Sequence, residues 1–111
     1  MPARHLLALP LGAAIACAAA AAAAQPVGDP DKGRTFASEA CASCHRIEPG
    51  VKWPLGDAPT FQTIADTRGM TGTALTVWFQ TSHPTMPNLI LTAAEKADVI
   101  AYILSLRSRP Q

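Results

Sequence analysis

Two cysteines and a histidine lie within five consecutive residues, Cys41-Ala42-Ser43-Cys44-His45. The spacing Cys-x-x-Cys-His is that of the attachment sequence for c-type haem. The two thiols of such a sequence bond the two vinyl groups on one edge of the porphyrin, and the two-residue gap lets one helical turn present both thiols. The adjacent imidazole then lies beneath the iron as its proximal ligand. The segment therefore predicts one covalent haem c, attached at Cys41 and Cys44, with His45 as an iron ligand.

Other kinds of site also use paired cysteines. A thioredoxin-like redox pair needs a strand–helix–strand pattern, and none surrounds Cys41. A zinc site needs two further ligands at short spacing, and the rest of the domain offers only His83. A disulfide between Cys41 and Cys44 would close too small a loop to stabilise a fold. Haem attachment agrees best with the sequence.

The composition also indicates a bound cofactor. Hydrophobic residues make up 49% of the chain, but residues 1–24 contain 19 of them. The other 87 residues contain 35, about 40%, which is below the usual globular share. A domain this small with so few apolar residues normally needs a disulfide, a metal or a cofactor. A covalent haem would supply a large apolar surface around which the domain can pack.

The charge balance argues against nucleic-acid binding. The chain has nine Lys and Arg residues and eight Asp and Glu residues, which gives a formal net charge of +1. Because Arg4 precedes the predicted domain, the domain itself is neutral, with no broad basic surface and no acidic tail. We expect no nucleic-acid partner.

The first 24 residues have the pattern of an export signal. Arg4 and His5 form a short basic start, residues 6–16 form an apolar core, and Ala22-Ala23-Ala24 is a small-residue cleavage site. We therefore predict a signal peptide over residues 1–24, with cleavage after about Ala24.

Two alternatives to a cleaved signal remain open. Residues 6–24 nearly reach the roughly 20 apolar residues that span a bilayer, so an uncleaved anchor is one alternative. Lipid attachment at Cys17 is the other. In each case the domain at residues 25–111 leaves the cytoplasm, and we predict a periplasmic location. We expect membrane contact only if the leader is retained or lipidated.

A first helix is predicted just before the haem motif. Asp29-Pro30-Asp31 is a typical helix start, with an Asp cap and Pro in the first turn, and the helix should extend to about Cys41. Gly33 lies inside this helix, where Gly costs about 1 kcal/mol relative to Ala. It is either a tolerated surface residue or the site of a close helix crossing.

Two short helices are predicted in the middle of the chain, over residues 60–65 and 73–80. Residues 48–59 contain three Pro and two Gly and form a loop, and residues 81–91 form a second loop. In the second short helix, the predicted apolar face consists of Leu75, Trp78 and Phe79.

A final helix begins at the capping box Thr92-x-x-Glu95 and should extend to about Leu106. No strand pattern occurs anywhere in the domain, so we predict an all-α fold packed around the haem. The predicted inward stripe of the last helix consists of Val99, Tyr102, Ile103 and Leu106.

With these motifs in order, the sequence resembles the small bacterial class I cytochromes c over most of residues 29–107. The resemblance implies a monohaem cytochrome c fold in which the first and last helices cross near Gly33 and Tyr102. It also implies that a late Met is the sixth iron ligand and that the carbonyl of Pro59 is the partner of the axial His. Many relatives have an aromatic residue four positions before the first haem Cys, where this chain has Ala37, with Phe36 one place away. The segments that carry the resemblance are Gly33-x-x-Phe36, Cys41-Ala42-Ser43-Cys44-His45, Pro59-x-Phe61, Met86-Pro87-Asn88 and Asp98-Val99-Ile100-Ala101-Tyr102-Ile103-Leu104-Ser105-Leu106.

Three residues are candidates for the second axial ligand. Met86 precedes Pro87, which favours an extended backbone, and it lies in a loop 41 residues after His45. His83 would give bis-imidazole ligation, and Met70 is a candidate whose usual role would be packing. We predict Met86, with His83, Met70 or an open position as the alternatives.

Further side chains are candidates for contacts with the porphyrin. Trp53 and Trp78 could donate their indole N–H to a propionate or toward the axial sulfur, or could pack on the porphyrin. Arg46, Lys52 and Arg68 could offset the propionate charges, or could remain solvated.

These predictions define two functional classes. A Met/His ligand pair raises the haem potential and fills both axial positions, which favours electron transfer over oxygen chemistry. We therefore predict an electron-transfer protein and not an enzyme, either a periplasmic carrier or the cytochrome subunit of an exported oxidoreductase, with redox protein partners. The alternative is a haem-based gas sensor or haem enzyme with an open distal site. The sequence shows no distal His–Arg arrangement of the peroxidase kind to support it.

Overall fold

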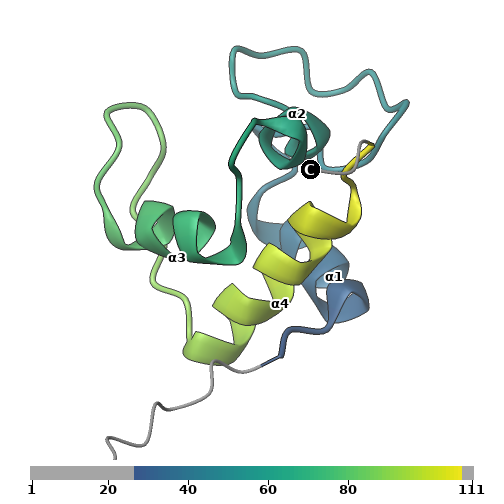
Figure 1. The fold of residues 1–111 in the computed structure, drawn as a ribbon. Helices are drawn as coiled ribbons and strands as arrows, with labels where there is room; N and C mark the ends of the chain where they lie inside the picture. The colour runs from purple at the N-terminus through teal and green to yellow at the C-terminus, as the bar shows by residue number, and fades with distance from the viewer. Residues whose placement is uncertain (1–26, 109–111) are drawn as a thin grey trace, which may run out of the picture.

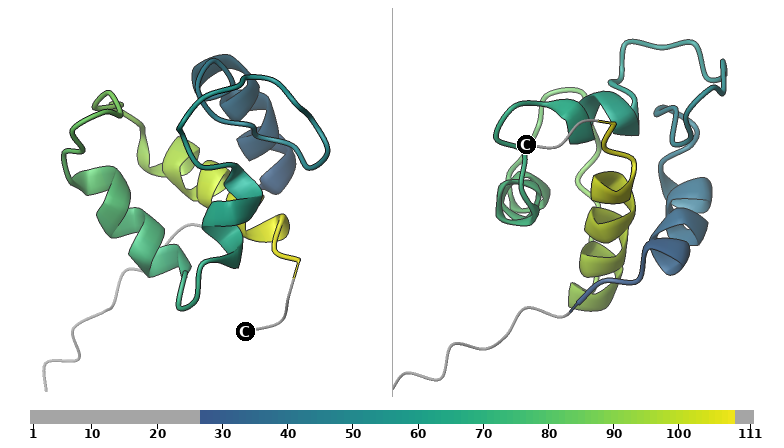
Figure 2. Two further views of the ribbon diagram at one scale, coloured as in Figure 1. Left: turned by 90° about the horizontal axis from the view of Figure 1, so that it is seen from above. Right: turned by 45° about the vertical axis from the view of Figure 1, so that its right-hand side comes forward.

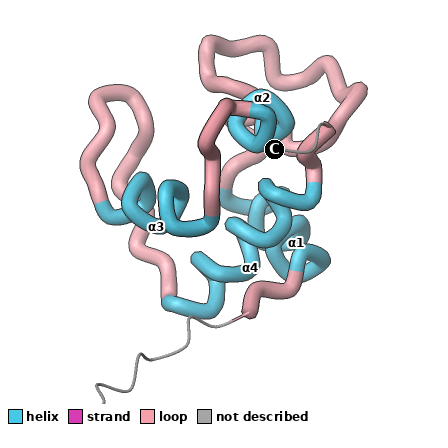
Figure 3. Tube along the Cα trace, viewed as in Figure 1, coloured by secondary structure: helices cyan, strands magenta, loops and turns pink. Residues whose placement is uncertain are grey.

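The computed structural model describes residues 27–108, and these residues form four helices and no strand. The helices are α1 (Pro30–Ala40), α2 (Phe61–Asp66), α3 (Gly72–Gln80) and α4 (Ala93–Ser105), joined by two long loops (Figures 1 and 3). The all-α prediction is confirmed. The predicted signal peptide and Cys17 lie outside the described residues. Within residues 27–108, no helix has the length and apolar character needed to cross a bilayer.

A side-chain N-cap stands at the start of each helix and accepts hydrogen bonds from amides of the first turn. The Asp29 carboxylate accepts hydrogen bonds from the first-turn amides of α1, and the hydroxyl groups of Thr60 and Thr71 do the same for α2 and α3. Thr92 and Glu95 form the predicted capping box of α4, in which each side chain bonds the other residue's backbone N–H. Local sequence therefore determines where each helix begins.

Helix α4 lies between α1 and α3 (Figure 2). It crosses α1 at Gly33, where a β-carbon would lie 2.0 Å from the Asp98 carbonyl oxygen and 2.9 Å from the Tyr102 Cβ. Ala37 lies one turn further along the same face of α1 and is fully buried. The crossing near Gly33 and Tyr102 is therefore as the family resemblance implies. The small Ala37 side chain lies in the core, and Phe36 packs at its edge.

The described residues pack one small core, to which α4 contributes most. Of the predicted stripe, Val99, Tyr102 and Ile103 are buried, and Leu106 is partly buried and packs against the core. On α3, Leu75 is buried and Phe79 packs against the core, but Trp78 is 56% exposed. Trp78 therefore does not pack into the described core, and its ring instead meets that of His83 in the loop that follows α3. The buried residues are Ala37, Cys41, Ile47, Phe61, Ala65, Leu75, Val99, Ile100, Tyr102 and Ile103.

We predict that Gly33→Ala lowers the thermal unfolding temperature of the haem-loaded protein. The added methyl group would overlap the α4 backbone, and overpacking of this kind costs about 1–3 kcal/mol. Gly72→Ala is the matched control, because a β-carbon there would meet its nearest neighbour at 3.6 Å. If Gly33→Ala is as stable as Gly72→Ala, the helices do not cross this closely.

Candidate functional site

The Cys-x-x-Cys-His segment continues from α1 as a helical turn. The Cys41 amide donates to the Ala37 carbonyl at 2.9 Å, and the Cys44 and His45 amides donate to the Cys41 carbonyl at 3.1 and 2.9 Å. This turn is the local structure that the two-residue spacing predicts. It places the Cys41 side chain in the core and leaves the Cys44 side chain exposed.

The two thiols lie in different environments. Burial raises the pKa of the Cys41 thiol to about 11. At neutral pH Cys41 is therefore protonated and behaves as a small apolar side chain. No disulfide joins it to Cys44, so both sulfur atoms are free for thioether bonds to a porphyrin.

Three long-range hydrogen bonds fix the residues that follow the second cysteine. His45 Nδ1 lies 2.7 Å from the Pro59 carbonyl oxygen. The Phe61 amide donates to the Arg46 carbonyl at 3.0 Å, and the Tyr102 hydroxyl donates to the Ile47 carbonyl at 2.9 Å. Residues 45–47 are thereby tied to the loop before α2, to α2 itself and to α4.

The bond to Pro59 determines how His45 can act. Because a carbonyl oxygen only accepts, Nδ1 carries the proton, and Nε2 is the nitrogen left to bind a metal. The resemblance implied this partner, and the structure contains the bond. The Phe61 ring packs beside the imidazole, with centroids 5.5 Å apart, and beside Tyr102 on its other side, at 6.2 Å. The His45 ring is thus oriented both by a hydrogen bond and by packing.

The sequence did not predict the part that the Tyr102 hydroxyl plays. Its position in the inward stripe of α4 predicted burial, but the bond to Ile47 joins residues 55 positions apart. The one signal was a tyrosine in an otherwise aliphatic stripe, since a buried hydroxyl group needs a partner. The sequence also did not predict the ion pair between Arg34 of α1 and Glu48, in which Arg34 Nε lies 2.8 Å from Glu48 Oε1.

The end of α3 and the loop that follows it line an open cavity of about 250 Å³, formed by residues 78–83 and 86–89. Two candidate axial ligands, His83 and Met86, lie on this cavity, and both are partly buried. Met70 lies elsewhere and packs against the core, and its carbonyl accepts a 2.6 Å hydrogen bond from Arg107. Two of the three candidates are therefore brought together, and Met70 has the packing role.

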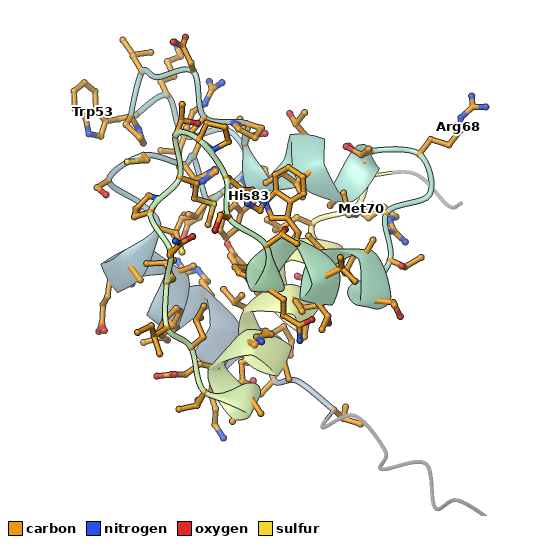
Figure 4. All side chains as sticks on the ribbon, turned by 90° about the vertical axis from the view of Figure 1, so that its left-hand side faces the viewer. Trp53, Arg68, Met70 and His83 are labelled. Carbon is orange, nitrogen blue, oxygen red and sulfur yellow. The ribbon has the colours of Figure 1, made fainter. Side chains whose placement is uncertain are left out.

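The side chains predicted to contact the porphyrin do not lie together in the structure. Trp78 lines the cavity, and its ring meets that of His83 edge-on, with centroids 3.8 Å apart. Arg46 and Lys52 line a second hollow in the loop before α2. In Figure 4, Trp53 and Arg68 project from opposite sides of the molecule, whereas His83 and Met70 lie within its outline. Arg68 is an exposed surface charge, as its alternative interpretation predicted.

The distribution of buried residues fits a haem. No residue of segments 48–60 and 76–98 is buried, although together they make up a large part of the described chain. Large apolar side chains in these segments are exposed, among them Trp53 at 73% and Leu55 at 78%. Exposed apolar side chains in both segments, Trp53 and Leu55 in the first and Trp78 and Ile90 in the second, are typical of a surface that a ligand covers. A porphyrin attached at Cys41 and Cys44 would supply the apolar surface that this part of the protein lacks.

The described residues are all helical or loop, the Cys-x-x-Cys-His segment forms a helical turn, and His45 is oriented by Pro59. These features are typical of a c-type haem protein. The chain is 33% identical to cytochrome c-552 of Bradyrhizobium diazoefficiens over 103 residues, which make up 93% of this chain and 96% of that protein. No family model and no solved structure matches the chain. It belongs to the small class I monohaem cytochromes c. Its cofactor is one covalent haem c with iron, and its activity is haem-based electron transfer.

We predict that Tyr102→Phe destabilises the haem-loaded protein by roughly 1–3 kcal/mol in denaturant unfolding, because the Ile47 carbonyl loses its buried donor. Ser38→Ala is the control, since it removes an exposed hydroxyl hydrogen bond from α1 that water can replace. Equal stability of the two variants would mean that the Tyr102 bond does not fix residues 45–47.

Proposed function

We propose that the protein transfers single electrons between redox partners outside the cytoplasm, with His45 and Met86 as the axial ligands of its iron. The observation that carries this proposal is the position of Met86 on the cavity after α3, while Met70 packs in the core. The orientation of His45, with Nδ1 bonded to Pro59, supports the other half of the ligand pair. With both axial positions filled, the iron has no open site for oxygen chemistry.

The haem supplies one-electron chemistry when bound, because its iron changes between the ferric and ferrous states. The residues of the chain set the conditions for that change. Cys41 and Cys44 hold the porphyrin covalently, and the Pro59 bond fixes the tautomer and orientation of the His45 imidazole. The Met86 thioether raises the potential relative to a second imidazole. No substrate is turned over by the domain, so we propose no enzyme activity.

The setting of this activity rests on the sequence. We propose that residues 1–24 are a signal peptide, that residues 25–111 form the cytochrome domain, and that the domain acts in the periplasm. Its partners are redox proteins, met transiently by a free carrier or as neighbouring subunits of an exported oxidoreductase. Membrane contact follows only if the leader is retained or lipidated at Cys17.

The ligand pair is tested by spectroscopy of the haem-loaded protein. We predict a low-spin reduced spectrum that carbon monoxide does not change, and a weak far-red iron–sulfur band when the protein is oxidised. Met86→Ala removes that band and lowers the potential, within the range of about 0.8 V over which axial ligands set haem potentials. Met70→Ala is the control and keeps the band. Loss of the band in Met70→Ala and not in Met86→Ala would reverse the assignment.

A further inference from the structure

His83 has a buried nitrogen that the fold of the polypeptide leaves unpaired. Its Nε2 is shielded from solvent and has no hydrogen-bond partner, and within residues 27–108 it is the one side-chain nitrogen or oxygen in this condition. An unpaired buried polar group destabilises the folded state, so native proteins rarely retain one without a reason. An unpaired imidazole nitrogen on a cavity of a haem protein is a candidate iron ligand, because imidazole binds iron well.

The position of His83 in the chain matches this use. His83 precedes Met86 by three residues, a span of at most about 11 Å of extended chain, and both residues line the cavity after α3. The backbone of residues 82–91 makes no hydrogen bond to the backbone of the rest of the described chain, so such bonds do not hold this loop in place. A small movement of this loop would exchange one side chain for the other.

We propose that His83 is a reserve axial ligand, whose Nε2 binds the iron when the Met86 sulfur does not. This inference rests on the proposed Met86 ligation. In the resting protein, the His83 ring packs edge-on against Trp78, which holds it to the wall of the cavity. When Met86 is lost as a ligand, the iron keeps six ligands and stays closed to small molecules, at a lower potential. His83 on this loop therefore keeps the sixth coordination position filled and excludes small molecules from the iron.

The test compares three variants of the haem-loaded protein: Met86→Leu, His83→Asn, and the double variant. Leu approximates the volume of Met, so the loop keeps its packing. Met86→Ala serves as a second background. We expect Met86→Leu to be low-spin without the far-red band. We expect the double variant to be high-spin when oxidised and, when reduced, to bind carbon monoxide at least tenfold more tightly than Met86→Leu.

His83→Asn alone is expected to keep the far-red band, because Met86 remains bound. The proposal is overturned if Met86→Leu and Met86→Ala are both high-spin, or if the double variant stays low-spin through another ligand such as Lys52. A wild-type protein without the far-red band, together with a high-spin His83→Asn variant, would make His83 the resting ligand. That outcome contradicts the Met86 ligation itself, so the failure of the proposed function can be told apart from the failure of the reserve role.

Discussion

Contact between the polypeptide and the haem is what the rest of this fold depends on. The core built by the described residues lies where α4 meets α1, α2 and α3. No residue is buried in segments 48–60 and 76–98, which contain the loops before α2 and after α3 together with the end of α3 and the start of α4. Those loops carry exposed tryptophan, leucine and valine side chains, which water solvates poorly. A porphyrin held at Cys41 and Cys44 would give these exposed apolar side chains a surface to pack against. The cofactor is thus both the redox centre and part of the hydrophobic core.

The same helices that form the core also orient His45, the proposed iron ligand. Helix α4 packs against α1 where Asp98 meets Gly33. One turn further along α4, the Tyr102 hydroxyl group donates a hydrogen bond to the Ile47 carbonyl. The Pro59 carbonyl sets the tautomer of His45, and the Phe61 ring contacts both the imidazole and the Tyr102 ring. The His45 imidazole is thus held in one orientation by a hydrogen bond and by ring packing. In contrast, the other candidate ligands, Met86 and His83, lie on a loop with little support of its own, and this difference underlies the exchange that we propose.

Local chemistry made much of the fold predictable. Asp29 and the Thr92–Glu95 pair predicted where α1 and α4 begin, and the Cys-x-x-Cys-His spacing predicted the helical turn. Gly33 showed the limit of this reasoning, because its pattern left both a surface position and a close helix crossing open, and the crossing was implied by the family resemblance. The outward direction of Trp78, the Tyr102–Ile47 bond and the Arg107 bond to Met70 depend on residues far apart in the chain. Helical periodicity carries no information about them.

The most direct test of the central claim is to measure helix content and thermal unfolding of the Cys41→Ala/Cys44→Ala chain by circular dichroism, beside the haem-loaded protein. If the haem is part of the core, the double variant has a weak helical signal and no cooperative transition, while the haem-loaded protein unfolds cooperatively. A double variant that keeps the full helical signal and unfolds in one sharp transition would show that the polypeptide folds without its cofactor, and would contradict the claim that the haem is part of the core.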